Sequence, residues 1–130
     1  METRYFAYIR CSTTQQNYDR QYKQLNDFIK KEGIKLSNEN IVCEKRTGKN
    51  QDRPLFKKLI SELKKLEAKG IHCCLILVEL SRMGRSYQLT KDTWNELTSA
   101  GVDIVVTSFP LLDTRKKADG AVNLMLTDIV

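Results

Sequence analysis

The sequence predicts an α/β fold, a three-layer sandwich in which a central, mostly parallel β-sheet is flanked by helices. Apolar runs typical of buried strands alternate with stretches whose apolar residues recur at helical spacing, and glycines follow those stretches. Parallel pairing is expected because a helix between two strands carries the chain back across the sheet. With 130 residues, 41% of them hydrophobic, the chain is long enough to bury a core as one domain.

The first half of the chain supplies two predicted strands and one helix between them. Residues 5–10 form an apolar strand. From about Asp19 the positions of Tyr, Leu, Phe and Ile recur at helical spacing, until Gly33 stops the pattern. Residues 41–44 are short and apolar, which predicts a second strand.

The second half predicts two more helices and two more strands. Pro54 suits the first turn of a helix, and a stripe of leucine, isoleucine and phenylalanine continues from it to Gly70. Residues 73–78 are continuously apolar, as in a strand that is covered on both faces. A helix over 87–100 and a strand over 102–106 complete the order β-α-β-α-β-α-β.

The end of the first strand carries the most informative pair of side chains. Side chains alternate along a strand, so Arg10 and Ser12 share a face about 7 Å apart, while Cys11 points away. A guanidinium binds two phosphate oxygens as a fork and stays charged. A hydroxyl nucleophile beside such a cation indicates phosphodiester chemistry.

Further arginines are expected at the same place, because binding sites of parallel sheets gather at the carboxyl ends of the strands. Arg82 and Arg85 follow the third strand and face one way if they lie on a helical turn. Arg53 lies at the start of a helix, where anions are attracted. Together they predict a serine ringed by arginines, able to stabilise a pentacoordinate phosphorus without a metal ion.

These motifs, in this order and spacing, resemble the catalytic domain of the serine recombinases, the resolvase and invertase family. The matching positions are Tyr8-Ile9-Arg10-Cys11-Ser12-Thr13, Gln16, Asp19, Gln21, Thr47-Gly48, Asp52-Arg53-Pro54 and Leu80-Ser81-Arg82-Met83-Gly84-Arg85. The resemblance implies that Ser12 attacks DNA and becomes joined to the 5′ phosphate. Since the covalent bond preserves the energy of the broken one, religation needs no ATP and no metal.

The resemblance also implies roles for the remaining site residues. Arg10, Arg82 and Arg85 hold the scissile phosphate, Arg53 and Thr47 support them, Gln16 and Gln21 position the nucleophile loop, and Tyr8 orients Arg10. Ser81 is a departure, because the family usually has aspartate there, and serine can form hydrogen bonds but supplies no charge. We expect Ser81 to orient Arg82 still, with Glu79 as a substitute carboxylate.

The expected partner is double-stranded DNA, which the net charge of +6 and the pI near 9.2 favour. The resemblance implies a homodimer that assembles into a tetramer, and a bacterial or phage origin. No segment has the length of a membrane span or the pattern of a leader, so a cytoplasmic protein is expected. No nucleotide-binding or metal-binding motif indicates a cofactor.

Residues 1–130 are expected to form the catalytic domain, with the apolar stretch 118–130 as the start of a dimerisation helix and a DNA-binding domain beyond 130. Alternatives stay open: a weakened or inactive dimerisation or DNA-binding module, a Tyr8 nucleophile, or a small phosphatase. Resolvase, invertase, integrase and transposase remain undistinguished. His72 is expected to be a surface residue without partners, and the four cysteines to be reduced thiols.

Overall fold

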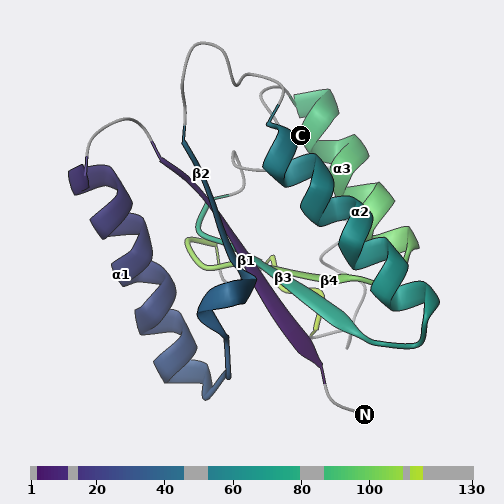
Figure 1. Ribbon diagram of the computed structural model, residues 1–130, viewed down its shortest axis with the longest axis horizontal. Coiled ribbons are helices and arrows are strands. Elements are labelled where there is room, and N and C mark those ends of the chain that lie inside the picture. The colour runs from purple at the N-terminus through teal and green to yellow at the C-terminus, as the bar shows by residue number, and fades with distance from the viewer. Residues whose placement is uncertain (1–2, 12–14, 46–52, 80–86, 110–111, 116–130) are drawn as a thin grey trace.

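The computed structural model describes residues 3–11, 15–45, 53–79, 87–109 and 112–115 (Figure 1). Its elements are β1 (Arg4–Cys11), α1 (Gln15–Glu32), the 3-10 helix η1 (Asn38–Asn40), β2 (Ile41–Lys45), α2 (Pro54–Ala68), β3 (Cys73–Leu77), α3 (Tyr87–Ser99) and β4 (Asp103–Val106). The described strands form one parallel sheet in the order β2-β1-β3-β4. One face is covered by α1 and the other by α2 and α3, which confirms the predicted α/β sandwich (Figure 1).

The strand alternation predicted for β1 decides which side chains face which helices. Tyr8 belongs to the core cluster between the sheet and the helices α2 and α3, whereas Ile9 belongs to the cluster under α1. All of β3 is buried, as its continuous apolar sequence predicts. Trp94 is 1% exposed and packs in the core, the place expected for an aromatic residue at helical spacing.

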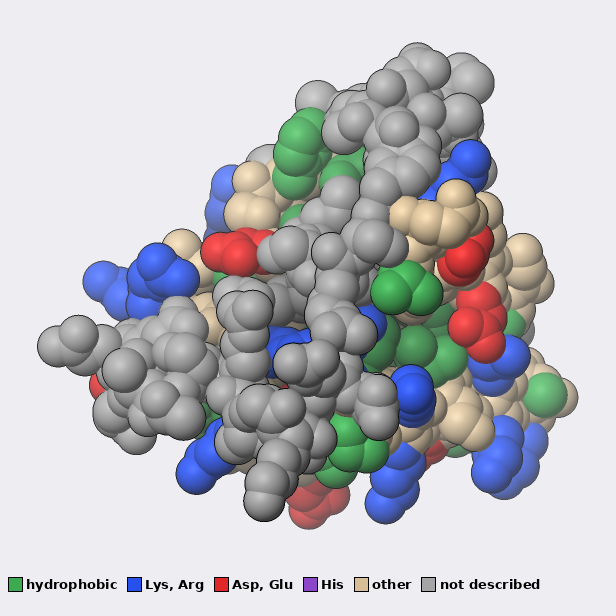
Figure 2. Space-filling view, turned by 90° about the horizontal axis from the view of Figure 1, so that it is seen from above, with side chains coloured by type: hydrophobic (Ala, Val, Ile, Leu, Met, Phe, Trp, Pro, Cys, Tyr) green, Lys and Arg blue, Asp and Glu red, His purple; other side chains and the backbone are tan. Residues whose placement is uncertain are grey.

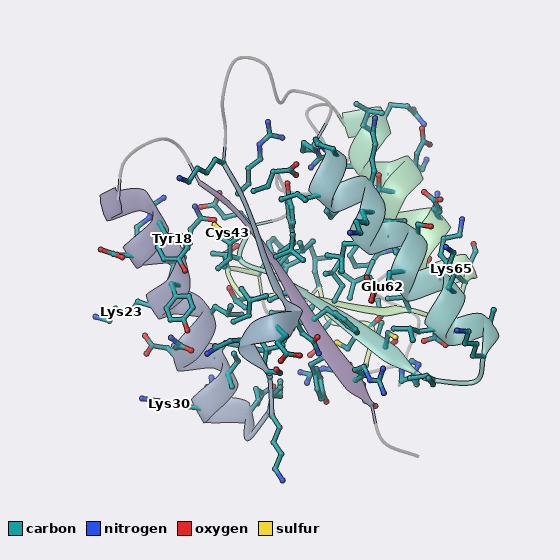
Figure 3. All side chains as sticks on the ribbon, in the orientation of Figure 1. Tyr18, Lys23, Lys30, Cys43, Glu62 and Lys65 are labelled. Atoms are coloured by element: carbon teal, nitrogen blue, oxygen red, sulfur yellow. The ribbon has the colours of Figure 1, made fainter. Side chains whose placement is uncertain are left out.

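The helix α1 begins at Gln15, four residues before the periodicity indicates. Its first turn is polar and carries no apolar stripe, so hydrophobic spacing reveals the helix only once Tyr22 and Leu25 follow. Lys23 and Lys30 of α1 and Lys65 of α2 point away from the sheet, as expected of solvated helix faces (Figure 3).

The cysteines in the described part of the chain have no disulfide partner. Cys73 and Cys74 are fully buried in β3, and burial raises the pKa of the Cys73 thiol to about 11 and that of Cys74 further. They are structural thiols, as predicted. Among the described helices, none has the length and apolar character to cross a bilayer.

Candidate active site at the carboxyl edge of the sheet

The side chains of interest lie where the strands end, which we call the carboxyl edge of the sheet. In the register of β1 and β2, Arg10 lies directly beside Glu44, and Arg53 immediately precedes α2. Figure 2 views the molecule from above, and Lys and Arg side chains appear on several sides of it. Of the predicted site residues, the structure describes the side chains of Tyr8, Arg10, Gln21 and Arg53. For Gln16 it describes only the position in α1. Ser12, Thr47, Ser81, Arg82 and Arg85 lie outside the described residues.

Arg10 is buried at the end of β1, with 7% of the residue exposed. Its backbone carbonyl accepts a hydrogen bond of 2.8 Å from the Nε2 of Gln21, a fully buried residue of α1. Gln21 therefore ties the end of β1 to α1 just before the chain reaches position 12. The role expected for Gln21 in positioning the nucleophile loop stays a prediction.

Tyr8 lies two residues before Arg10 in β1 and is completely buried. Its hydroxyl donates a hydrogen bond of 2.7 Å to Glu44 Oε1. The centre of its ring lies 4.4 Å from the centre of the Phe56 ring. Burial, together with the Glu44 carboxylate, raises the pKa of the phenol well above its ordinary value. Complete burial and the hydrogen bond to Glu44 keep this hydroxyl away from DNA, which disfavours Tyr8 as a nucleophile.

Glu44 organises this edge, and the sequence reasoning missed it. The residue is 1% exposed, and besides the Tyr8 hydroxyl it accepts the backbone N–H groups of Leu55 (2.9 Å) and Phe56 (3.3 Å). These donors belong to the first turn of α2, where helices leave N–H groups without intrahelical partners. A carboxylate is stabilised there by the helix dipole as well. An acid ending an otherwise apolar strand was the signal that could have identified it.

Arg53 immediately precedes the helix turn that Glu44 binds. It is the one non-glycine residue in the described part of the chain with a positive φ, at 49°. Its side chain does not cap α2, and the guanidinium lies 4.5 Å from the centre of the Phe56 ring. Burial lowers the pKa of Arg53, and the nearby charge of Arg10 lowers it further, against the opposing effects of Tyr8 and Glu44. Left-handed backbone at such a site costs about 1 kcal/mol or more.

The structure thus brings Tyr8, Arg10 and Arg53 together around Glu44, although these residues come from β1, β2 and the start of α2. Arg10 lies beside Glu44 in the strand register, and the charges of Arg10 and Glu44 both act on Arg53, so two guanidinium groups lie near one another at this edge. Arginine pairs of this kind bind phosphate oxygens. Glu79, the expected substitute carboxylate, follows β3 and is partly buried.

Comparison with known proteins identifies the family of the chain. The family model described as "Resolvase, N terminal domain" matches residues 5–129, nearly the whole chain. The chain belongs to the resolvase family. This confirms the family predicted from the motifs and associates the chain with site-specific recombination.

Two solved structures share the fold of this resolvase-family chain. One is the N-terminal catalytic domain of TP901-1 integrase, which is 20% identical with a TM-score of 0.66 over 97% of this chain and 89% of that one. The other is a resolvase family site-specific recombinase from Streptococcus pneumoniae, 18% identical with a TM-score of 0.67 over 98% and 85%. At these identities the likeness establishes the α/β architecture.

Proposed function

We propose that this chain is the catalytic domain of a site-specific DNA recombinase that cuts and rejoins DNA through Ser12, without metal or nucleotide. Family membership supports the reaction class. The single observation that carries the proposal is the convergence of Arg10 and Arg53 at the carboxyl edge, where β1 delivers the chain to Ser12. A serine in that position attacks a phosphate whose negative charge is already compensated by the two arginines.

In the proposed reaction, the Ser12 hydroxyl gives up its proton and its oxygen attacks the phosphorus of a DNA phosphodiester, so that the proton lost balances the one that the leaving oxygen gains. The bond between phosphorus and the 3′ oxygen breaks, and that oxygen leaves as a hydroxyl after taking up a proton. A 5′-phosphoserine bond remains, and attack by a 3′ hydroxyl reverses the step. Arg10, Arg82 and Arg85 stabilise the charge on the phosphoryl oxygens, and Arg53 and Thr47 assist. Gln16, Gln21 and Ser81 hold these groups in place.

The partners follow from the same proposal. The substrate is double-stranded DNA, and two dimers of the protein pair as a tetramer so that both duplexes are cut before exchange. Residues 1–130 are then the catalytic domain, with a dimerisation helix starting in 118–130 and DNA recognition supplied by a domain beyond it. The net charge of +6 supports a polyanionic substrate, and the host is a bacterium or a phage, with the protein acting in the cytoplasm.

Trapping of covalent protein–DNA adducts on supercoiled plasmid tests the nucleophile. The parent and Cys11→Ser should form adducts, whereas Ser12→Ala should form none while keeping the circular dichroism of the parent. Cys11→Ser is the matched control because it changes the neighbouring nucleophilic atom. Adducts from Ser12→Ala would refute the assignment, and so would adducts that require added metal ions.

One observation favours a second candidate, a domain that has kept the fold and lost the reaction. Ser81 stands where the family usually has aspartate, which removes a negative charge beside Arg82. DNA binding by the parent without any adduct, together with adducts from Ser81→Asp, would identify such a weakened domain.

A further inference from the structure

His72 lies at the opposite edge of the sheet, which we call the amino edge because β1, β3 and β4 begin there. Its Nδ1 is 2.8 Å from Glu67 Oε1 near the end of α2, and its Nε2 is 2.7 Å from Asp103 Oδ2 at the start of β4. The side chain is 28% exposed. The expectation of a surface histidine without partners was therefore wrong, because the fold brings both carboxylates to it from distant positions.

The geometry indicates the protonation state of the ring. An ionised carboxylate only accepts hydrogen bonds, and a neutral imidazole has one N–H and one lone pair. A neutral His72 could donate to only one of Glu67 and Asp103, and its lone pair would face the oxygen of the other. Only the imidazolium donates to both, so the two short contacts fit a doubly protonated, charged ring.

Both carboxylates are held in place by other groups as well. Glu67 Oε1 also accepts the backbone N–H of Cys73 at 2.8 Å. Asp103 Oδ1 accepts the hydroxyl of Thr114 at 2.8 Å. Gly101 leaves room for the first of them, because a Cβ there would lie 3.2 Å from Glu67 Oε2. The acceptors for His72 are thus pre-positioned from α2 and β4.

The charges around this cluster come from several elements. Arg4 of β1 is one of the charged residues, and its backbone N–H donates to the His72 carbonyl at 2.8 Å. Other titratable groups near the cluster are Glu62 of α2, the Cys73 thiol of β3, and Asp113 and Arg115 beyond β4. Burial by itself lowers the pKa of His72, but its hydrogen bonds with Asp103 and Glu67 outweigh burial and leave that pKa above its ordinary value.

We propose that protonated His72 is a pH-sensitive clamp that fastens the end of α2 to β3 and β4. The clamp concerns the folding of the domain and does not depend on the proposed recombination. Because the folded pKa of His72 is raised, its contribution to stability is fully present below the unfolded pKa of about 6.5. It is lost as the pH rises through the folded pKa.

Nuclear magnetic resonance can follow this residue directly, since the chain contains one histidine. We expect its ring to titrate with a pKa above about 6.5, with both nitrogens protonated below that pKa. Asp103→Asn and Glu67→Gln should each lower that pKa. Glu96→Gln is the matched control, because Glu96 pairs with Lys64 on the exposed surface and should leave it unchanged. A parent pKa at or below 6.5, or no response to Asp103→Asn, would overturn the clamp.

Urea unfolding of the parent and of His72→Gln between pH 6 and pH 9 tests the consequence. The ratio of their unfolding equilibrium constants should be largest at pH 6 and should shrink about tenfold for each unit by which folding raises the pKa. The cysteine thiols ionise above about pH 8 in the unfolded state of both proteins, so their effect cancels in the ratio. A ratio independent of pH would contradict the proposal. If His72→Gln fails to fold, the histidine pKa in the parent and in the two carboxylate variants still decides.

Discussion

Both edges of the sheet place charged side chains at the ends of buried strands, but they do so with different residues and different partners. At the carboxyl edge, the Glu44 carboxylate binds the Tyr8 hydroxyl and the first turn of α2, with Arg10 and Arg53 nearby. At the amino edge, two carboxylates, Glu67 and Asp103, share one imidazole, His72. The acids of the amino edge are thus paired with a histidine, whereas the acid of the carboxyl edge holds a helix start beside two arginines. Of the two clusters, only the carboxyl one carries arginines of the kind that bind a phosphate.

Backbone strain separates the two edges as well. Arg53 adopts a left-handed conformation at the start of α2, and residues rarely keep such a conformation without compensation. At the amino edge, the positive φ of 98° beside the His72 cluster belongs to a glycine, Gly101, for which it is ordinary. Among the described residues, strain of this kind at a non-glycine residue is therefore confined to Arg53.

Among the substitutions that test this difference between the two edges, Arg10→Lys should have the largest effect. Lysine keeps one positive charge but cannot bind two phosphate oxygens as a fork, so adduct formation should fall about 100-fold or more. His72→Gln, at the other edge, should form adducts at the parent rate at pH 7. Adduct trapping on supercoiled plasmid measures both. The reverse pattern would place the chemistry at the amino edge.

Glu44→Gln tests the organiser of the carboxyl edge. The amide keeps the shape of the side chain but turns a donor towards either Tyr8 or the first N–H groups of α2. We expect a loss of about 2 kcal/mol in the free energy of unfolding, since a buried charged acceptor is removed. Urea denaturation measures it, and Glu62→Gln on the exposed face of α2 is the control. Equal losses in the two variants would disprove the organising role.

The strain at Arg53 is tested by comparing Arg53→Gly with Arg53→Ala. Both variants lose the guanidinium and its contact with Phe56. Glycine accepts φ of 49° without a Cβ clash, so Arg53→Gly should be more stable than Arg53→Ala by about 1 kcal/mol. Thermal unfolding gives the difference, and adduct formation should be weakened equally in both. An alanine variant as stable as the glycine variant would show that the strain is negligible.

The smallest effect is expected for Tyr8→Phe. The variant keeps the ring against Phe56 and removes one hydrogen bond to Glu44, which costs about 1 kcal/mol of stability. Covalent adducts should persist, because the Tyr8 hydroxyl is fully buried and bound to Glu44 and so does not reach DNA. Their loss, with the fold intact, would revive the tyrosine nucleophile and sharpen the question of what Ser12 does.

Much of the carboxyl edge could be predicted from the sequence. The alternation of β1 places Tyr8 and Arg10 on one face, and the proline at 54 places Arg53 at a helix start, so their approach followed from the strand order. The roles of Glu44 and His72 were not predicted, because each has partners on other elements: Tyr8 lies 36 residues from Glu44, and Asp103 lies 31 residues from His72. Patterns of spacing describe neighbours in sequence and carry no information on such pairs.

The sequence by itself determined the order of strands and helices, the buried faces of β1 and β3, and the family to which the chain belongs. These follow from periods of two and 3.6 residues and from motifs, which are local properties of the chain. Only the tertiary structure decided which charges meet. A carboxylate at the end of one strand reaches a helix, or a histidine reaches two elements, only after the sheet has set its register, since the pairing geometry is a property of the assembled layers.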